Sequence, residues 1–192
     1  ELAALWGKIA SMGGAVDALI CPPAPYIEAA AAASLGTGLL VGAQDCGAVA
    51  EDSARTGEIS AAMLADAGAA YVIVGHSERR SLHGESNALV ARKAAAGLAA
   101  GLVPIICVGE TLAERESGRV GEIVGAQVRD SVPETATDVV VAYEPVWAIG
   151  GNRTPTPAEI AEVHALIRET LAERFPARAN ATRILYGGAV GP

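Results

Sequence analysis

The stretch Val139-Val-Val-Ala-Tyr-Glu-Pro-Val-Trp-Ala-Ile-Gly150 decides the fold, because in it an apolar run leads directly into a carboxylate, Glu144. Parallel strands that are covered on both faces read as continuous runs of Val, Ile and Ala. The first polar residue after such a run lies at the rim of the sheet, where α/β proteins bind their ligands. The stretch therefore predicts a buried parallel strand with a functional residue at its carboxyl end.

The residues that follow Glu144 favour a catalytic role for it. Pro145 fixes the direction of the chain, Trp147 can shield a site from water, and Gly150-Gly-Asn152 gives the backbone the freedom that a moving lid needs. A carboxylate at a rim can also simply pair with an arginine, and Glu144 taken alone fits both roles. Its neighbours tip the interpretation towards a general base.

Composition limits the classes of function. The 192 residues, 51% of them hydrophobic, predict a single domain over residues 1–192 with a well-buried core. The net charge of −8 offers no basic surface for nucleic acid or an anionic membrane, so we expect a small substrate. No apolar run approaches the roughly 20 residues of a membrane span. The first residues have the pattern of an amphipathic helix, and we read no targeting segment in them.

The chain has three cysteines, Cys21, Cys46 and Cys107, each at or near the end of a predicted strand. Their odd number and wide spacing match neither a disulfide framework nor a zinc site. A reducing cytoplasm is the compartment that fits best.

Short apolar runs alternate with longer segments of helical spacing. The runs predict six strands, at Ala18 to Cys21, Leu39 to Ala43, Tyr71 to Gly75, Val103 to Val108, Val139 to Tyr143 and Arg183 to Tyr186. The segments between them predict helices at Tyr26 to Leu35, Ile59 to Ala67, Asn87 to Ala100, Arg119 to Ser131 and Ala158 to Arg174. Strands separated by helices imply right-handed crossovers and a parallel sheet.

Each predicted strand is followed by residues that could take part in binding or catalysis. They are Pro22-Pro23, Gln44-Asp45, His76-Ser77-Glu78-Arg79-Arg80, Gly109-Glu110, Glu144 and Gly187-Gly188. An open doubly wound sheet is the alternative architecture, but no Gly-x-Gly-x-x-Gly follows the first strand and the rim groups occur on nearly every strand. The distribution favours a barrel.

His76 is the second candidate for catalysis. It follows Val72-Ile-Val-Gly75 and precedes Ser77-Glu78, a pair suited to the first turn of a helix, whose dipole would disfavour an imidazolium. A neutral imidazole could then donate to a carbonyl. Most histidines are structural, but a place at a strand end favours function, and His83 and His164 have no such context.

The remaining rim residues have supporting roles. We expect Glu78, Arg79 and Arg80 to form ion pairs around the site with carboxylates such as Glu58 or Glu110. Cys107 is interpreted as buried packing behind the site.

Glycines at the rim offer backbone N–H groups for an anion. Gly187-Gly188-Ala189 could present such groups, and Gly150 could add another when the lid closes. A Gly-Gly pair is by itself weak evidence for a phosphate site.

Six motifs together resemble the triosephosphate isomerase family. They are Gly42-Ala-Gln-Asp-Cys46, Thr56-Gly-Glu-Ile-Ser60, Val74-Gly-His-Ser-Glu-Arg-Arg80, Cys107-Val-Gly-Glu110, Ala142-Tyr-Glu-Pro-Val-Trp-Ala-Ile-Gly150 and Tyr186-Gly-Gly188. They occur in order over nearly the whole chain. The resemblance implies an α/β fold of the TIM (β/α)₈-barrel type that interconverts dihydroxyacetone phosphate and glyceraldehyde 3-phosphate through an enediolate.

The resemblance also implies roles for individual residues. Glu144 would move the proton and His76 would be the neutral electrophile, in a family that is itself the standard example of a helix-tuned neutral histidine. Gly150, Gly188 and Ala189 would hold the phosphate, with Glu78 and Cys107 in support. No metal or organic cofactor is implied, since moving a proton next to a carbonyl needs only a base, an electrophile and charge stabilisation.

The chain departs from the family pattern at both ends. We find no counterpart of the opening strand with its Asn-x-Lys, because Lys8 and Lys93 lie on predicted helices, and none of the eighth strand with its Gly-Gly loop. We therefore expect an incomplete barrel of about six parallel strands, reduced activity, and a homo-oligomer, a dimer, that covers the exposed barrel edges.

Other functions stay open at this point. The chain could be an inactive barrel that serves as a folding or assembly scaffold. A different sugar-phosphate enzyme, an epimerase or an aldolase, lacks support because no metal-ligand set or Schiff-base lysine follows a strand. The family resemblance favours a cytoplasmic isomerase of glycolysis and gluconeogenesis.

Overall fold

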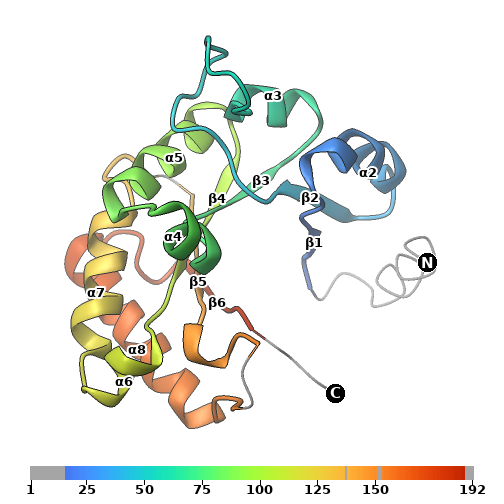
Figure 1. Cartoon of the computed structure of the whole chain (residues 1–192). Helices are drawn as coiled ribbons and strands as arrows, with labels where there is room; N and C mark the ends of the chain where they lie inside the picture. The colour runs from blue at the N-terminus through green and yellow to red at the C-terminus, as the bar shows by residue number, and fades with distance from the viewer. Residues whose placement is uncertain (1–15, 137, 151–152, 189–192) are drawn as a thin grey trace.

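The computed structural model describes residues 16–136, 138–150 and 153–188, which form one parallel sheet with helices along its outer side (Figure 1). Its strands are β1 (Ala18–Ile20), β2 (Leu39–Ala43), β3 (Tyr71–Val74), β4 (Val103–Val108), β5 (Val140–Tyr143) and β6 (Arg183–Tyr186). Each strand pairs in parallel with the next one in the sequence, in the order β1-β2-β3-β4-β5-β6. The described residues therefore form a half-barrel.

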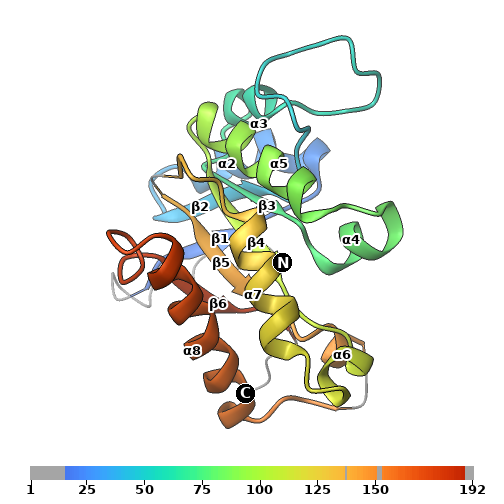
Figure 2. The same ribbon diagram turned by 90° about the vertical axis from the view of Figure 1, so that its left-hand side faces the viewer.

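The helices connect successive strands. They are α2 (Ile27–Ser34), α3 (Ala61–Asp66), α4 (Ser77–His83), α5 (Asn87–Ala99), α6 (Leu112–Glu116), α7 (Val120–Ser131) and α8 (Pro157–Arg174), with 3₁₀ turns η1 (Ala24–Tyr26) and η2 (Val146–Ala148). In the view of Figure 2, α5, α7 and α8 lie in front of the sheet and cover its outer face. Among the described residues, no helix is long and apolar enough to cross a membrane.

The predicted strands are confirmed to within one residue at every end, and the five predicted helices to within two residues. Two short helices, α4 and α6, were not predicted as elements, because five to seven residues are too few for a helical period to show. The amphipathic helix expected at the start of the chain lies outside the described residues.

Short polar side chains begin the main helices. Ser60, Ser86 and Thr156 each accept a hydrogen bond from a backbone N–H in the first turn of the helix that follows, which satisfies a group with no partner inside the helix. Gly68 and Gly101 follow α3 and α5 with φ of 93° and 79°, a conformation that suits glycine and ends a helix. These local signals fix where the helices begin and end, so that each following strand runs towards the same rim of the sheet.

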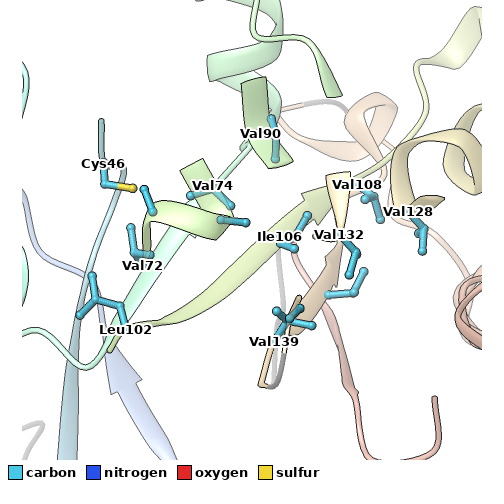
Figure 3. Close-up of a cluster of buried hydrophobic side chains, with 14 of the residues drawn as sticks. Cys46, Val72, Val74, Val90, Leu102, Ile106, Val108, Val128, Val132 and Val139 are labelled. Carbon is cyan, nitrogen blue, oxygen red and sulfur yellow. The ribbon is translucent and has the colours of Figure 1, made fainter. Parts of the chain in front are cut away.

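The main core lies between the outer face of the sheet and the helices (Figure 3). It contains alternate residues of the central strands with apolar residues of α5 and α7, among them Val72, Val74, Ile106, Val108, Val90 and Val128. Each fully buried side chain of this size contributes on the order of 1.5–3 kcal/mol to folding. This layer fixes the strands that carry the site.

A second apolar layer lies on the inner, concave face of the sheet. Ile105 and Cys107 of β4 and Val140 and Ala142 of β5 form it, and Cys107 lies opposite Ala142 in the strand register. Because side chains alternate along a strand, the position two residues after Ala142 points to the same inner face. That position is Glu144.

The first and last described strands are linked on their exposed side. Arg183 of β6 lies 2.6 Å from Asp17, the residue before β1. Both side chains are more than half exposed, so the pair adds little stability.

Candidate active site

Glu144 follows β5 and remains in the hydrogen-bond ladder of the sheet. Its N–H donates to the carbonyl of Val108 at 2.7 Å, so its backbone is held as firmly as a strand residue. The residue is only 7% exposed although it carries a carboxylate. A nearly buried carboxylate on a rigid strand end can serve as a base with a fixed direction.

His76 lies next to Glu144. It is the N-cap of α4, directly after β3, and its Nε2 is 3.0 Å from Oε1 of Glu144. The other carboxylate oxygen, Oε2, accepts a hydrogen bond from the N–H of Ser77 at 3.1 Å. The structure thus brings together the two residues that the sequence singled out, from strands that are two apart in the sheet.

The hydrogen bonds of His76 assign its tautomer. Nδ1 accepts from the N–H of Glu78 in the first turn of α4 at 3.3 Å, so a neutral imidazole has its proton on Nε2, facing Glu144. The pKa of His76 is raised, first by its hydrogen bond to Glu144, while its partial burial acts in the opposite direction. The expectation from the helix dipole alone was a lowered pKa, and the carboxylate outweighs the dipole in this arrangement.

Two glycines make room for Glu144, and sequence reasoning missed their function. A Cβ on Gly109 would lie 1.7 Å from the carbonyl oxygen of Glu144, and a Cβ on Gly187 would lie 3.0 Å from its Cγ. Both follow strands that flank β5, so the rims of β4 and β6 close on the base from two sides. The signal that could have revealed them is a glycine directly after an apolar strand.

Gln127 of α7 holds Gly109 in place. Its amide accepts from the N–H of Gly109 at 2.6 Å and donates to the carbonyl of the same residue at 3.0 Å. This two-point contact connects a helix of the outer layer to the backbone that touches Glu144. No sequence pattern pointed to Gln127.

Cys107 lies behind the base on the inner face of β4. It is buried, and its pKa is raised well above the ordinary value, first by burial and then by the nearby carboxylate of Glu144. The thiol therefore stays protonated and is no nucleophile. The interpretation of Cys107 as buried packing agrees with this position.

A second carboxylate, Glu110, organises the segment after Glu144. It is fully buried, and its Oε1 accepts hydrogen bonds from Tyr143 Oη at 3.0 Å, Trp147 Nε1 at 2.8 Å and Arg115 Nη1 at 2.9 Å. Its other oxygen, Oε2, has no partner among the described residues. Glu110 thereby connects the ends of β4 and β5 to η2.

The expected partners of Arg79 and Arg80 were wrong. Arg79 pairs with Asp45 and Glu85, and Lys93 joins the same two carboxylates at 2.7 Å and 2.6 Å. The expected carboxylates have other partners: Glu110 pairs with Arg115, and Glu58 with Arg55. Only the pairs with Asp45 join residues far apart in the sequence, but each arginine has several acids within reach, and no local pattern selects among them.

Arg80 has no carboxylate partner among the described residues. Its guanidinium donates instead to the carbonyls of Gly75 and Cys107 and to the side chains of Asn87 and Ser131. It therefore fastens α4 to the ends of β3 and β4, which carry the site.

The other predicted site residues are Glu78, Gly150, Gly188 and Ala189, and their places relative to Glu144 and His76 differ. Glu78 is next to His76 in the chain and its side chain points largely to solvent. Gly188 follows Gly187 directly, and Gly150, with φ of 67°, comes after η2. Ala189 lies outside the described residues.

Neither a metal-binding cluster nor a hollow near α4 coincides with the pair within the described part of the chain. Within residues 16–136, 138–150 and 153–188, no group of three or more His, Cys, Asp or Glu side chains could hold a metal ion. A hollow of about 780 Å³ lies between Pro23, the loop 47–59 and α4, and neither Glu144 nor His76 lines it.

Comparisons with known proteins agree with this arrangement. A sequence profile described as triosephosphate isomerase matches residues 2–192. The triosephosphate isomerase of Afipia carboxidovorans is 56% identical over all of this chain and 77% of its own length, and that of Xanthobacter flavus is 56% identical over 94% and 73%. The crystal structure of triosephosphate isomerase from Bartonella henselae superposes with a TM-score of 0.89 at 43% identity, over 99% of this chain and 76% of that one.

The described residues form a six-stranded half-barrel with the carboxylate of Glu144 and the imidazole of His76 at its rim, and the relatives match the chain over nearly its whole length. The chain belongs to the triosephosphate isomerase family.

Proposed function

We propose that Glu144 and His76 interconvert dihydroxyacetone phosphate and glyceraldehyde 3-phosphate through an enediolate. The observation that carries the proposal is the 3.0 Å approach of His76 Nε2 to Glu144 Oε1 at the carboxyl ends of β3 and β5. A base and a hydrogen-bond donor side by side are what a proton transfer next to a carbonyl requires.

Glu144 takes the proton and returns it. Its carboxylate removes a proton from the carbon that carries the hydroxyl, the electrons of that C–H bond form the enediolate, and the protonated carboxyl then delivers the proton to the neighbouring carbon. In the same conversion His76 gives its Nε2 proton to the oxygen on the second carbon and takes the hydroxyl proton from the oxygen on the first, so that the new carbonyl forms there and the imidazole ends neutral. Gly109 lets the end of β4 pack against the backbone of Glu144, and Gly187 leaves room for its side chain, so the carboxylate is held at a fixed place. Fixing a base in this way lowers the entropic part of the barrier.

His76 stabilises the negative oxygen during that transfer. Nδ1 is held by the N–H of Glu78, so the Nε2 proton is available for a substrate oxygen. Glu144 is the first cause of the raised pKa of His76, and that cause weakens once the carboxylate turns to a substrate carbon. The imidazole then favours the neutral form, which the N-terminus of α4 also supports.

The phosphate of the substrate would lie on backbone N–H groups at Gly150, Gly188 and Ala189. Gly188 is adjacent to Gly187, which contacts the base, so an anion there would be close to the reacting carbons. Backbone amides can bind phosphate without a lysine or arginine. Phosphate binding at these three residues remains a prediction.

We expect turnover to be low. Lys93, the one lysine within the described part of the chain, is held by Asp45 and Glu85 and does not contact Glu144 or His76. A positive group next to an enediolate is worth several kcal/mol of barrier lowering, and none is seen beside the described pair. An inactive scaffold is the second candidate, but no observation favours it, because the base and its partner are kept in contact.

The proposal extends to assembly and location. We treat residues 1–192 as one domain, supported by the single sheet, and we propose a homodimer. The hollow of about 780 Å³ is lined by charged residues of α4 and the loop 47–59. Exposed apolar residues such as Tyr26 and Leu82 follow or precede lining residues closely in the sequence, and such residues suit burial against a second copy. All three cysteines are free thiols, which is in keeping with a reducing cytoplasm.

The experiment is a coupled isomerase assay on the purified chain across a range of protein concentrations. Glu144→Gln should lower kcat by at least 10²-fold, the usual size of a general-base contribution. Glu122→Gln is the matched control, because Glu122 is an exposed carboxylate on α7 paired only with Arg119. Equal rates for the parent and Glu144→Gln would contradict the proposed function, and sedimentation of a single monomeric species would contradict the dimer.

A further inference from the structure

Arg153 makes two contacts that bind neighbouring elements together. Its guanidinium carbon lies 4.6 Å from the centre of the Trp147 ring, over the indole of η2. Its Nη2 also lies 2.5 Å from Oε1 of Glu159 in the first turn of α8. Arg153 thus connects η2, which follows Glu144, with α8, the next helix in the chain.

A second arginine approaches the same ring from another element. Arg115 of α6 lies 5.0 Å from the centre of the Trp147 ring, and it pairs with both Glu110 and Glu159. The indole is therefore held at three points, by two guanidinium groups and by the hydrogen bond from its Nε1 to Glu110. Cation–π contacts are worth about 0.5–1 kcal/mol each at exposed sites.

Glu159 allows two positive groups to lie near one ring. Its Oε1 accepts from both Arg115 and Arg153, while its Oε2 accepts from the N–H and hydroxyl of Thr156 in the capping box of α8. The pKa of Glu159 is lowered, first by the backbone hydrogen bond of Thr156 and further by the two arginines. The carboxylate thus stays ionised and offsets the repulsion between the guanidinium groups.

The clamped ring is close in the chain to the proposed base. Trp147 is three residues after Glu144, and the N–H of Val146 between them donates to the carbonyl of Glu110 at 3.1 Å. Movement of the indole away from Glu110 would remove one of the two contacts by which Glu110 holds the segment that follows Glu144. The indole of Trp147 is thus connected through Glu110 to the segment that directly follows Glu144.

We infer that Arg153 is a positioning residue for the isomerase reaction, which acts by holding Trp147 against Glu110 through simultaneous contact with the indole and with Glu159. This role rests on the proposed function of Glu144. Arginine suits it better than lysine, because a planar guanidinium can stack on a ring and bond a carboxylate at the same time.

The test uses Trp147 as its own reporter. The chain has two tryptophans, and replacing the other one, Trp6→Phe, leaves Trp147 as the single source of indole fluorescence. In that background, Arg153→Gln is compared with Arg153→Lys and with Arg119→Gln. Arg119 is a matched control because its ion pair with Glu122 is exposed on α7 and is not among the contacts of Trp147.

Two readouts separate an anchoring role from general damage. For Arg153→Gln we expect a shifted Trp147 emission, about two- to threefold stronger quenching by acrylamide, and a three- to tenfold fall in kcat with little change in KM, which corresponds to a rise of about 0.6–1.4 kcal/mol in the barrier. Arg153→Lys should keep the ion pair and lose the stacking, so both readouts should lie between those of the parent and Arg153→Gln. Arg119→Gln should match the parent in both.

The outcomes distinguish this inference from the function on which it rests. Unchanged emission and quenching in Arg153→Gln would overturn the inference, whatever the activity of the chain. Changed fluorescence with the kcat of the parent would overturn the positioning role and leave only a structural contact. A parent without Glu144-dependent turnover would count against the proposed function, while the fluorescence would still decide whether Arg153 holds Trp147.

Discussion

Gly109 and Glu144 approach each other more closely than any side chain at position 109 would allow. A Cβ on Gly109 would lie 1.7 Å from the carbonyl oxygen of Glu144, whereas real Cβ contacts are essentially never shorter than 3.0 Å. The φ of Gly109 is not in the left-handed region, so the need for glycine comes from the contact and not from the backbone conformation. The base is thereby positioned by the neighbouring strand end.

Gly109→Ala should displace Glu144 and impair catalysis. The added methyl group cannot be accommodated without a shift of backbone, and a misplacement of about 1 Å at a catalytic group can cost on the order of 10²-fold in rate. We expect kcat to fall by about that factor, measured by the coupled isomerase assay.

Gly121→Ala is the control for this change. Gly121 lies in α7, where a Cβ would meet only Leu166 at 3.9 Å, and alanine is favoured over glycine inside a helix by up to about 1 kcal/mol. This variant should be as active as the parent and slightly more stable. Full activity in Gly109→Ala would show that the loop after β4 yields without moving the base.

The pKa of His76 should report on Glu144. Because a hydrogen bond to Glu144 is the first cause of its increase, Glu144→Gln should lower the pKa of His76. The titration can be followed by NMR of the imidazole protons, with the signals of the three histidines assigned through His→Gln variants. An unchanged pKa of His76 in Glu144→Gln would rule out the ion pair as its cause.

The same pair makes stability depend on pH in a defined direction. A histidine whose pKa is raised on folding stabilises the fold below its unfolded pKa of about 6.5, and this contribution is lost as the pH rises through the folded pKa. The parent should therefore lose more of its free energy of unfolding than Glu144→Gln as the pH rises above about 6.5. Urea unfolding of both proteins across that range measures the difference.

The strands and the two central site residues could be predicted because the signals for them lie within a few successive residues of the sequence. The strand that ends at Tyr143 could be read from five successive apolar residues, and the place of Glu144 followed from its position after them. His76 could be found in the same way, from a strand end and a helix start. For such residues, the parallel sheet itself converts a position in the sequence into a position in space.

The partners of charged residues could not be predicted because they depend on packing between distant segments. Lys93 meets Asp45 across 48 residues, and Gln127 meets Gly109 across the space between α7 and β4. Glu110 could be recognised as a rim residue, but its three donors come from α6, β5 and η2. A sequence pattern predicts which face of a helix or strand a side chain occupies, but it does not rank several possible charge partners for that side chain.

Removal of Lys93 should destabilise the fold strongly. Lys93 and Glu85 are both nearly buried and lie 2.6 Å apart, so Lys93→Met leaves a buried carboxylate without its nearest cation. Breaking a buried pair in this way costs about 3–5 kcal/mol. Urea unfolding should show a loss of this size.

A second substitution tests whether the buried charge is the reason. Adding Glu85→Leu to Lys93→Met removes the buried carboxylate, which in Lys93→Met keeps only Arg79 as a cation among the described residues, and the double variant should be more stable than Lys93→Met alone. Arg119→Gln, which breaks an exposed pair, should cost no more than about 1 kcal/mol. A double variant less stable than Lys93→Met would mean that packing, and not charge, is what Lys93 supplies.

His164 should act in the direction opposite to His76. It lies on α8 against Tyr143, with ring centres 6.2 Å apart and an angle of 80° between the rings, and its buried Nε2 has no hydrogen-bond partner among the described residues. Burial is the first cause that lowers its pKa, and Arg168 lowers it further. The folded protein therefore holds His164 neutral at pH values where the unfolded chain protonates it. Stability should fall as the pH drops below about 6.5 and should level off only below the folded pKa.

His164→Leu isolates this contribution. The variant should lose about 1 kcal/mol at pH 7.5 because the aromatic contact with Tyr143 is gone. As the pH drops from 7.5 to 5.5, its free energy of unfolding should fall less, or rise more, than that of the parent. His83→Gln, at an exposed position of α4, serves as the control and should follow the parent. Because His76 stabilises the fold at low pH and His164 destabilises it, the two contributions oppose each other in the parent, and Glu144→Gln and His164→Leu should change the pH dependence of stability in opposite directions. A slope in His164→Leu equal to that of the parent would mean that His164 has the same pKa in the folded and unfolded chain.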